Sequence, residues 1–135
     1  MTTTTTTRNL PMSFRKAFEA EHTRREIERH AREEADRAQQ EADHARAIQL
    51  HDALAAEQDF LNEKKLVLDI TRYAVTLDHE DFRLRAYFED GEVSVTSADK
   101  RSATTPTAAP RKQATVASVD EALSVMAQYL ADETH

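Results

Sequence analysis

The sequence contains no cysteine, no tryptophan and only one glycine among its 135 residues. The absence of cysteine excludes disulfides and thiolate chemistry, and it is compatible with a reducing cytoplasm, where we expect the protein to reside. A single glycine excludes the glycine-rich loops that cradle phosphate groups. No apolar run approaches the roughly 18 residues that a transmembrane helix needs, so we expect no membrane partner.

Basic side chains are also few relative to acidic ones. The chain has 25 acidic residues against 18 basic residues, which gives a formal net charge of -7. This balance argues against bulk electrostatic binding to nucleic acid. No serine, histidine and aspartate fall into a recognisable catalytic motif, so the sequence predicts neither an enzyme nor a cofactor.

The sequence does contain a long stretch of high helix propensity. Residues 12–63 are rich in Ala, Glu, Arg and Gln, and neither glycine nor proline interrupts them. A helix of this length would extend about 75 Å, so we predict a charged helix that is a coiled-coil candidate. The preceding residues 1–11 predict a disordered threonine-rich tail, and the sequence leaves open whether this tail is a targeting segment.

Within the predicted helix, small apolar residues recur at coiled-coil spacing. The residues Ala31, Ala35, Ala38, Ala42 and Ala45 alternate at intervals of four and three. An alanine seam is thin, and larger apolar side chains lie toward both ends of the stretch. We therefore interpret the alanine stretch as a spacer. We predict partner binding, to a second copy in a homo-oligomer or to another protein helix, through Phe14, Phe18, Leu50, Leu54 and Leu61.

Residues 64–99 predict a small antiparallel sheet of two or three strands. Asp90 and Gly91 lie between two alternating runs, which is a strong hairpin signal. A two-residue loop there would pair Phe88 with Val93 and so sort apolar from polar side chains on both strands. Residues 65–77 are ambiguous between strand and helix. If they form a strand, a bulge would explain the shift in their alternation.

The C-terminal part of the sequence predicts a linker followed by a helix. Residues 100–117 are basic and rich in Pro, Thr and Ala, as is typical of a linker. Ser118 and Glu121 form a capping box that opens a helix over 118–133, whose apolar face we expect to pack on the sheet. The predicted fold class is thus α+β: a long coiled-coil-like helix, a small antiparallel hairpin or meander, and an amphipathic C-terminal helix.

Two alternatives to a protein-binding function depend on other residues. Arg83, Arg85 and Tyr87 alternate on one predicted strand, and with the basic linker they suggest a nucleic-acid-associated regulatory protein. The acidic total and neighbouring carboxylates argue against this alternative. Two Glu-x-x-His elements, ending at His22 and His44, resemble ligand spacing in helical metal sites. Both occur on one polar helix, so we favour a metal-binding function least and predict no metal ligands.

The sequence therefore predicts a non-enzymatic interaction protein, an oligomerising scaffold or adaptor that acts through its long helix. It identifies neither the partner nor the number and direction of helices in an assembly. Those properties depend on which apolar side chains the folded chain leaves exposed.

Overall fold

The computed structural model describes residues 13–101 and 110–134. The predicted tail over 1–11 lies outside this range. The chain divides between Ala38 and Gln39 into two compact units. The described elements, in chain order, are α2 (Phe14–Ala55), α3 (Gln58–Glu63), β2 (Val67–Thr71), β3 (Ala74–Asp78), β4 (Phe82–Glu89), β5 (Glu92–Asp99), β6 (Pro110–Val116) and α4 (Val119–Thr134).

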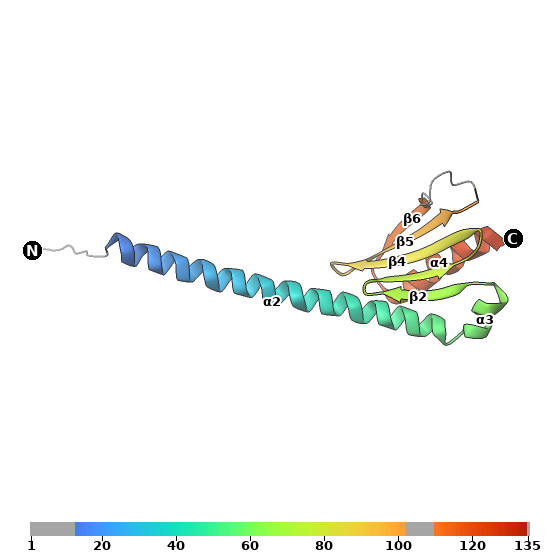
Figure 1. Cartoon of the computed structure of the whole chain (residues 1–135), viewed down its shortest axis with the longest axis horizontal. Helices are drawn as coiled ribbons and strands as arrows, with labels where there is room; N and C mark the ends of the chain where they lie inside the picture. The colour runs from blue at the N-terminus through green and yellow to red at the C-terminus, as the bar shows by residue number, and fades with distance from the viewer. Residues whose placement is uncertain (1–12, 102–109, 135) are drawn as a thin grey trace, which may run out of the picture. The chain divides into compact units, whose positions relative to one another are not determined.

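The predicted α+β class is confirmed. The sheet has five strands in the order β2-β3-β4-β5-β6, and every neighbouring pair is antiparallel (Figure 1). This is a simple meander, in which each strand pairs with the next one along the chain. The expected two or three strands are therefore present, together with others that the sequence pattern did not reveal.

The hairpin of β4 and β5 has the predicted register. Phe88 pairs with Val93 and Tyr87 pairs with Ser94, so buried and exposed side chains alternate along both strands. The connecting residues Asp90 and Gly91 have φ angles of 52° and 83°. A two-residue hairpin turn whose twist matches that of the strands requires positive φ at both central residues, as is found here.

Residues 65–77 form two strands and the turn between them. Ile70 pairs with Val75 across β2 and β3, and a two-residue turn at Arg72 and Tyr73 joins the strands. The shift in alternation is therefore a turn, and the bulge expected there is wrong. Arg72 has a φ of 50° without being glycine or asparagine, so this turn had no compositional signal.

The predicted linker over 100–117 has to be corrected for its second half. Residues 110–116 form β6, which pairs with β5 through Val93 with Val116 and Val95 with Ala114. Val116 packs against the hydrophobic core. The sequence misses this strand because its composition is that of a loop, and the edge of β5 supplies the pairing partner. Residues 102–109 lie outside the described part of the chain.

The predicted helix over 12–63 is two helices. α2 begins at Phe14, where the Ser13 hydroxyl accepts a hydrogen bond from the backbone N–H of Lys16 at 3.2 Å. After Ala55 the chain turns, and α3 follows. Lys65 then adopts a φ of 59°, and the N–H of Leu66 donates to the Leu61 carbonyl at 2.9 Å, which closes the helix end.

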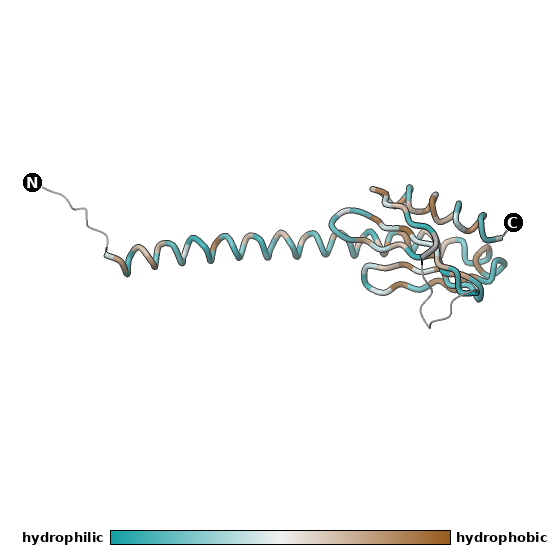
Figure 2. The backbone as a smooth tube through the Cα atoms, turned by 90° about the horizontal axis from the view of Figure 1, so that it is seen from above, coloured by the Kyte–Doolittle hydropathy of each residue, from teal (hydrophilic) through white to brown (hydrophobic). Residues whose placement is uncertain are grey.

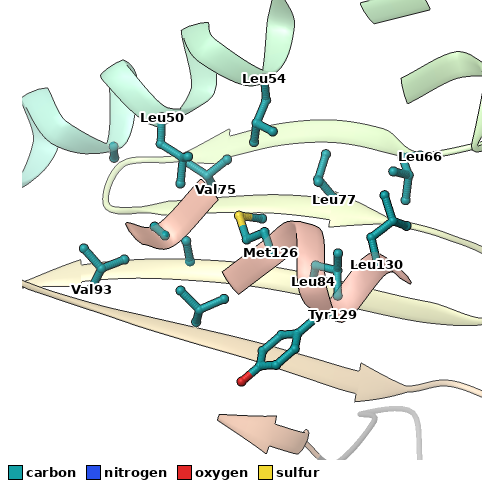
Figure 3. Packing of buried hydrophobic residues seen from close by; sticks show 14 of the residues in the cluster. Leu50, Leu54, Leu66, Val75, Leu77, Leu84, Val93, Met126, Tyr129 and Leu130 are labelled. Atoms are coloured by element: carbon teal, nitrogen blue, oxygen red, sulfur yellow. The ribbon is translucent and has the colours of Figure 1, made fainter. Parts of the chain in front are cut away.

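The core lies between one face of the sheet and the helices that cover it. Leu50 and Leu54 from α2 and Met126 and Leu130 from α4 all contribute to the same buried cluster as Val75 and other strand residues (Figure 3). The predicted packing of the C-terminal helix on the sheet is therefore confirmed. Burying each large side chain contributes about 1.5–3 kcal/mol to folding before entropic costs.

Candidate functional site

Helix α2 contains two stretches with opposite surroundings. No side chain is buried in residues 13–38, which we call the exposed segment. Hydrophilic residues predominate along it (Figure 2). From residue 43 onward the helix contributes the buried residues Asp43, Ala47, Leu50 and Leu54 to the domain formed by residues 39–134.

Arginine and glutamate side chains three or four residues apart form ion pairs along the exposed segment. Arg24 donates to Glu28 at 2.7 Å and also pairs with Glu21. Hydrogen bonds from Arg24 and then Arg25 lower the pKa of Glu21 to about 2. Arg29 makes a similar pair with Glu33 at 2.8 Å. Each exposed pair adds only a small stabilisation, so the helix here depends on many weak local interactions.

The exposed segment also carries large apolar side chains. Phe14, Phe18 and Ile27 are 91%, 60% and 65% exposed. The ring of Phe18 stacks on that of His22 with centroids 5.6 Å apart. Ile27 and Ala31 line a shallow apolar depression on the helix surface. Apolar groups exposed in this way are available to a partner. Binding through Phe14 and Phe18 is compatible with this exposure and stays a prediction.

The other three predicted partner-binding residues are used within the fold. Leu50, Leu54 and Leu61 are 0%, 8% and 2% exposed and belong to the domain core. The prediction that they bind another chain is therefore wrong. Seven-residue spacing identifies an apolar helix face, but it does not identify the surface that covers this face.

The alanine spacing does not continue into the leucine spacing on one face. Ala42 and Ala45 are exposed, whereas Ala47 and Leu50 are buried. With 3.6 residues per turn, Ala45 and Ala47 point about 160° apart around the helix. In the part of α2 within the domain the alanines and the leucines therefore lie on different faces, and only the leucine face belongs to the core.

Asp43 anchors α2 to the turn between β4 and β5. Its side chain is nearly completely buried. One carboxylate oxygen accepts a hydrogen bond from the N–H of Asp90 at 2.9 Å, and the other accepts from the N–H of Gly91 at 3.1 Å. Gln39 donates to the same carboxylate at 3.0 Å. A buried carboxylate with several donors is well compensated, so Asp43 has a structural role that the sequence did not indicate.

Arg46 and His44 extend this anchor to other loops. Arg46 donates to the carbonyls of Gly91 at 2.9 Å and Ala117 at 2.7 Å. The Nδ1 atom of His44 lies 2.6 Å from the Arg72 carbonyl oxygen in the turn between β2 and β3. These partners are 28 to 71 residues away in the sequence, so no local spacing could reveal them.

The predicted nucleic-acid residues Arg83, Arg85 and Tyr87 lie on the outer face of the sheet. Arg83 donates to Asp78 at 3.0 Å, and the Arg85 guanidinium lies 5.4 Å from the Tyr87 ring centroid. Burial would raise the pKa of Asp78, but hydrogen bonds from Lys100 and Arg83 outweigh this effect and lower it.

A shallow depression of about 470 Å³ on this face combines both signs of charge. Asp69, Asp78, Arg83 and Arg85 all line it. Phosphate backbones are bound by surfaces with a consistent excess of basic groups. The outer face therefore offers little electrostatic support for the nucleic-acid alternative.

Metal ligation was the least favoured alternative. Within residues 13–101 and 110–134, no group of three or more His, Cys, Asp or Glu side chains is placed to hold a metal ion. His44, from the second Glu-x-x-His element, faces the Arg72 carbonyl. No helix in the described part of the chain combines the length and apolar content needed to cross a membrane.

Comparison with models of known families, with curated protein sequences and with solved structures gives no match. The fold and the exposed segment define a small α+β protein with a long N-terminal helix. Its function has to be inferred from its own residues.

Proposed function

We propose that this chain is a non-enzymatic interaction protein, a scaffold or adaptor of the cytoplasm, whose exposed segment binds another protein chain. A second copy is the first candidate partner. The observation that supports this proposal is the exposure of Phe14 and Phe18, which contrasts with the burial of Leu50 and Leu54 from the same helix in the core.

The two phenylalanines are suited to act as binding anchors. They are four residues apart on a helix, so both side chains lie on one face. Aromatic anchors at this spacing are typical of helices that dock into apolar grooves. Burying a phenylalanine on association contributes about 1.5–3 kcal/mol, and aromatic side chains dominate the energetics of many interfaces.

The remaining features of α2 would reduce the cost of binding. Ion pairs such as Arg24 with Glu28 favour the helical conformation before a partner arrives. Asp43 and Arg46 fasten the following part of the same helix to the domain. A binding segment that is already ordered loses less conformational entropy on association.

Self-association can be tested by measuring mass with light scattering coupled to size exclusion. We expect the full chain to exceed its monomer mass of 15.3 kDa. Phe14→Gln combined with Phe18→Gln should bring the mass down to that of one chain, because glutamine keeps helix propensity but removes the aromatic surface. As a matched control, Ile48→Gln removes an exposed apolar side chain from the domain part of α2 and should leave the mass unchanged.

Ile27→Gln tests the second apolar position of the exposed segment. A decrease in mass with this variant alone would assign the contact to the middle of the helix, near Ala31, and not to its start. A wild-type chain that remains a single 15.3 kDa species up to high concentration, with its helicity intact, would contradict self-association.

A further inference from the structure

An apolar groove lies on the helical side of the domain, between α3 and α4. It has a volume of about 520 Å³. Leu54, Met126 and Leu130 point into the space between the helices and the sheet (Figure 3). Phe60, on α3, and Leu123 and Ala127, on α4, line the groove and are not buried. The domain therefore leaves an apolar surface next to its core uncovered.

The groove suits an apolar segment better than a polar small molecule. Small-molecule sites of this size combine an apolar lining with several convergent polar groups. Here the polar groups that line the groove are Glu57, Asp120 and Ser124. Two carboxylates and no basic side chain line it, so a fitting occupant would carry apolar side chains next to positive charge.

The start of α2 has this chemistry. Phe14 and Phe18 are exposed and lie on one helix face. Between them in the sequence are Arg15, which lies beside this face, and Lys16, which points away from it, and residues 13–18 include no acidic side chain. Arg15 pairs with Glu19 at 3.2 Å, and its side chain remains largely exposed.

We propose that the start of α2 of one copy docks into the groove between α3 and α4 of a second copy. Phe14 and Phe18 would cover the apolar lining, while Arg15, which lies beside this face of the helix, would approach Glu57 or Asp120. This inference rests on the proposed self-association and names the surface that receives the segment. The two surfaces differ, so the contact is heterologous, and repeating it builds a ring or an open row of chains.

Complementation between two full-length variants tests the proposal. The first variant, Phe14→Gln with Phe18→Gln, lacks the docking side chains but keeps the groove. The second, Phe60→Gln with Ala127→Gln, alters the groove at exposed positions and keeps the docking side chains. Each alone should have the mass of one chain. An equimolar mixture should form a two-chain complex, because one good contact is then available and no further chain can add.

Two measurements control for folding and for charge. Ala131→Gln makes the same substitution one turn further along α4, outside the groove lining, and should not change the mass. Circular dichroism should show the same helicity for all variants. Arg15→Glu and Glu57→Lys should each weaken self-association severalfold, and combining them in one chain should restore most of it.

The outcomes separate the groove from self-association in general. If the phenylalanine variant becomes monomeric but the groove variant keeps the wild-type mass, the groove proposal is overturned and the proposed function stands. The same holds if two monomeric variants fail to combine. If the wild-type chain has the mass of one chain throughout, the groove proposal and self-association are both overturned.

Discussion

The first and second halves of α2 belong to one helix but are stabilised by different interactions. In the exposed segment, side chains such as Arg24 and Glu28 pair with neighbours three or four residues away. In the domain, Leu50 and Asp43 contact residues far away in the sequence. A continuous helix can therefore change from local to tertiary stabilisation without any change in secondary structure.

The two halves also differ in what a substitution should cost. Exposed ion pairs are weak and screened by salt, whereas burial in a packed core contributes several kcal/mol per large side chain. The comparison predicts large effects in the domain and small ones in the exposed segment. A small loss of stability for a substitution in the domain, or a large loss for one in the exposed segment, would contradict this difference.

The largest effect is expected for Leu50→Ala. Leu50 is completely buried, so the substitution removes packing and leaves a cavity. We expect the free energy of unfolding to fall by about 2–5 kcal/mol in chemical denaturation followed by circular dichroism. Ile27→Ala, in the exposed segment, is the matched change and should alter domain stability very little. Equal losses for the two variants would contradict the division of α2.

Asp43→Ala should have the next largest effect. It removes the acceptor for the backbone N–H groups of Asp90 and Gly91 and for Gln39. We expect a loss of roughly 1–3 kcal/mol, because three partly buried donors then lose their common acceptor. Asp36→Ala removes an exposed carboxylate from the same helix and serves as the control. An unchanged denaturation midpoint for Asp43→Ala would show that the anchor does not stabilise the domain.

Gly91→Ala should have a smaller effect on the same anchor. The φ of Gly91 is 83°, and an added Cβ would meet only Gln39 at an ordinary 3.9 Å. The cost is therefore conformational, about 1–2 kcal/mol for a side chain in the left-handed region. Thermal unfolding measures it, with Glu92→Ala as the neighbouring control. A loss of unfolding free energy as large as that for Leu50→Ala would contradict a purely conformational cost, because the structure shows no close packing around Gly91.

The smallest effect concerns pH and the exposed segment. The folded-state pKa of Glu21 is about 2, below its ordinary value of 4.5. Its stabilisation of the helix is therefore present above pH 4.5 and is lost as the pH falls toward 2. The protection of the amides near Arg24 and Arg25 against hydrogen exchange, corrected for the intrinsic exchange rate at each pH, should decrease over this interval.

Glu21→Gln should remove the pH-dependent component near Arg24 and Arg25. Glu41→Gln is the control: Glu41 is exposed and forms no ion pair with the described residues. This variant should keep the pH-dependent component. Identical pH profiles for wild type and Glu21→Gln would show that the pairs of Glu21 do not contribute to helix order.

Local signals in the sequence predicted much of the fold. Gly91 allows the hairpin turn, and the alternating strands on either side then determine the register of Phe88 with Val93. Ser118 accepts a hydrogen bond from the N–H of Glu121 at 3.1 Å, as the capping box predicted. These features act over a few residues, so they are readable without knowledge of the rest of the chain.

The candidate site was predicted only in part. Phe14 and Phe18 are exposed as a binding function requires, but Leu50, Leu54 and Leu61 are not available. The same period-seven pattern would result from a coiled coil or from packing on a sheet. Choosing between them required knowledge of the whole sheet, in which β6 and the turn at Arg72 have no clear sequence signal.

The sequence by itself determined the long N-terminal helix, the C-terminal helix, the main hairpin and the α+β class, because propensity, capping and tight turns depend on neighbouring residues. It did not reveal the break between α2 and α3. Only the tertiary structure decided which part of α2 is covered, and which residues, such as Asp43, connect it to the sheet. It also decided that an apolar groove remains between α3 and α4. Contacts between distant segments follow no fixed spacing, so they become visible only once the chain is folded.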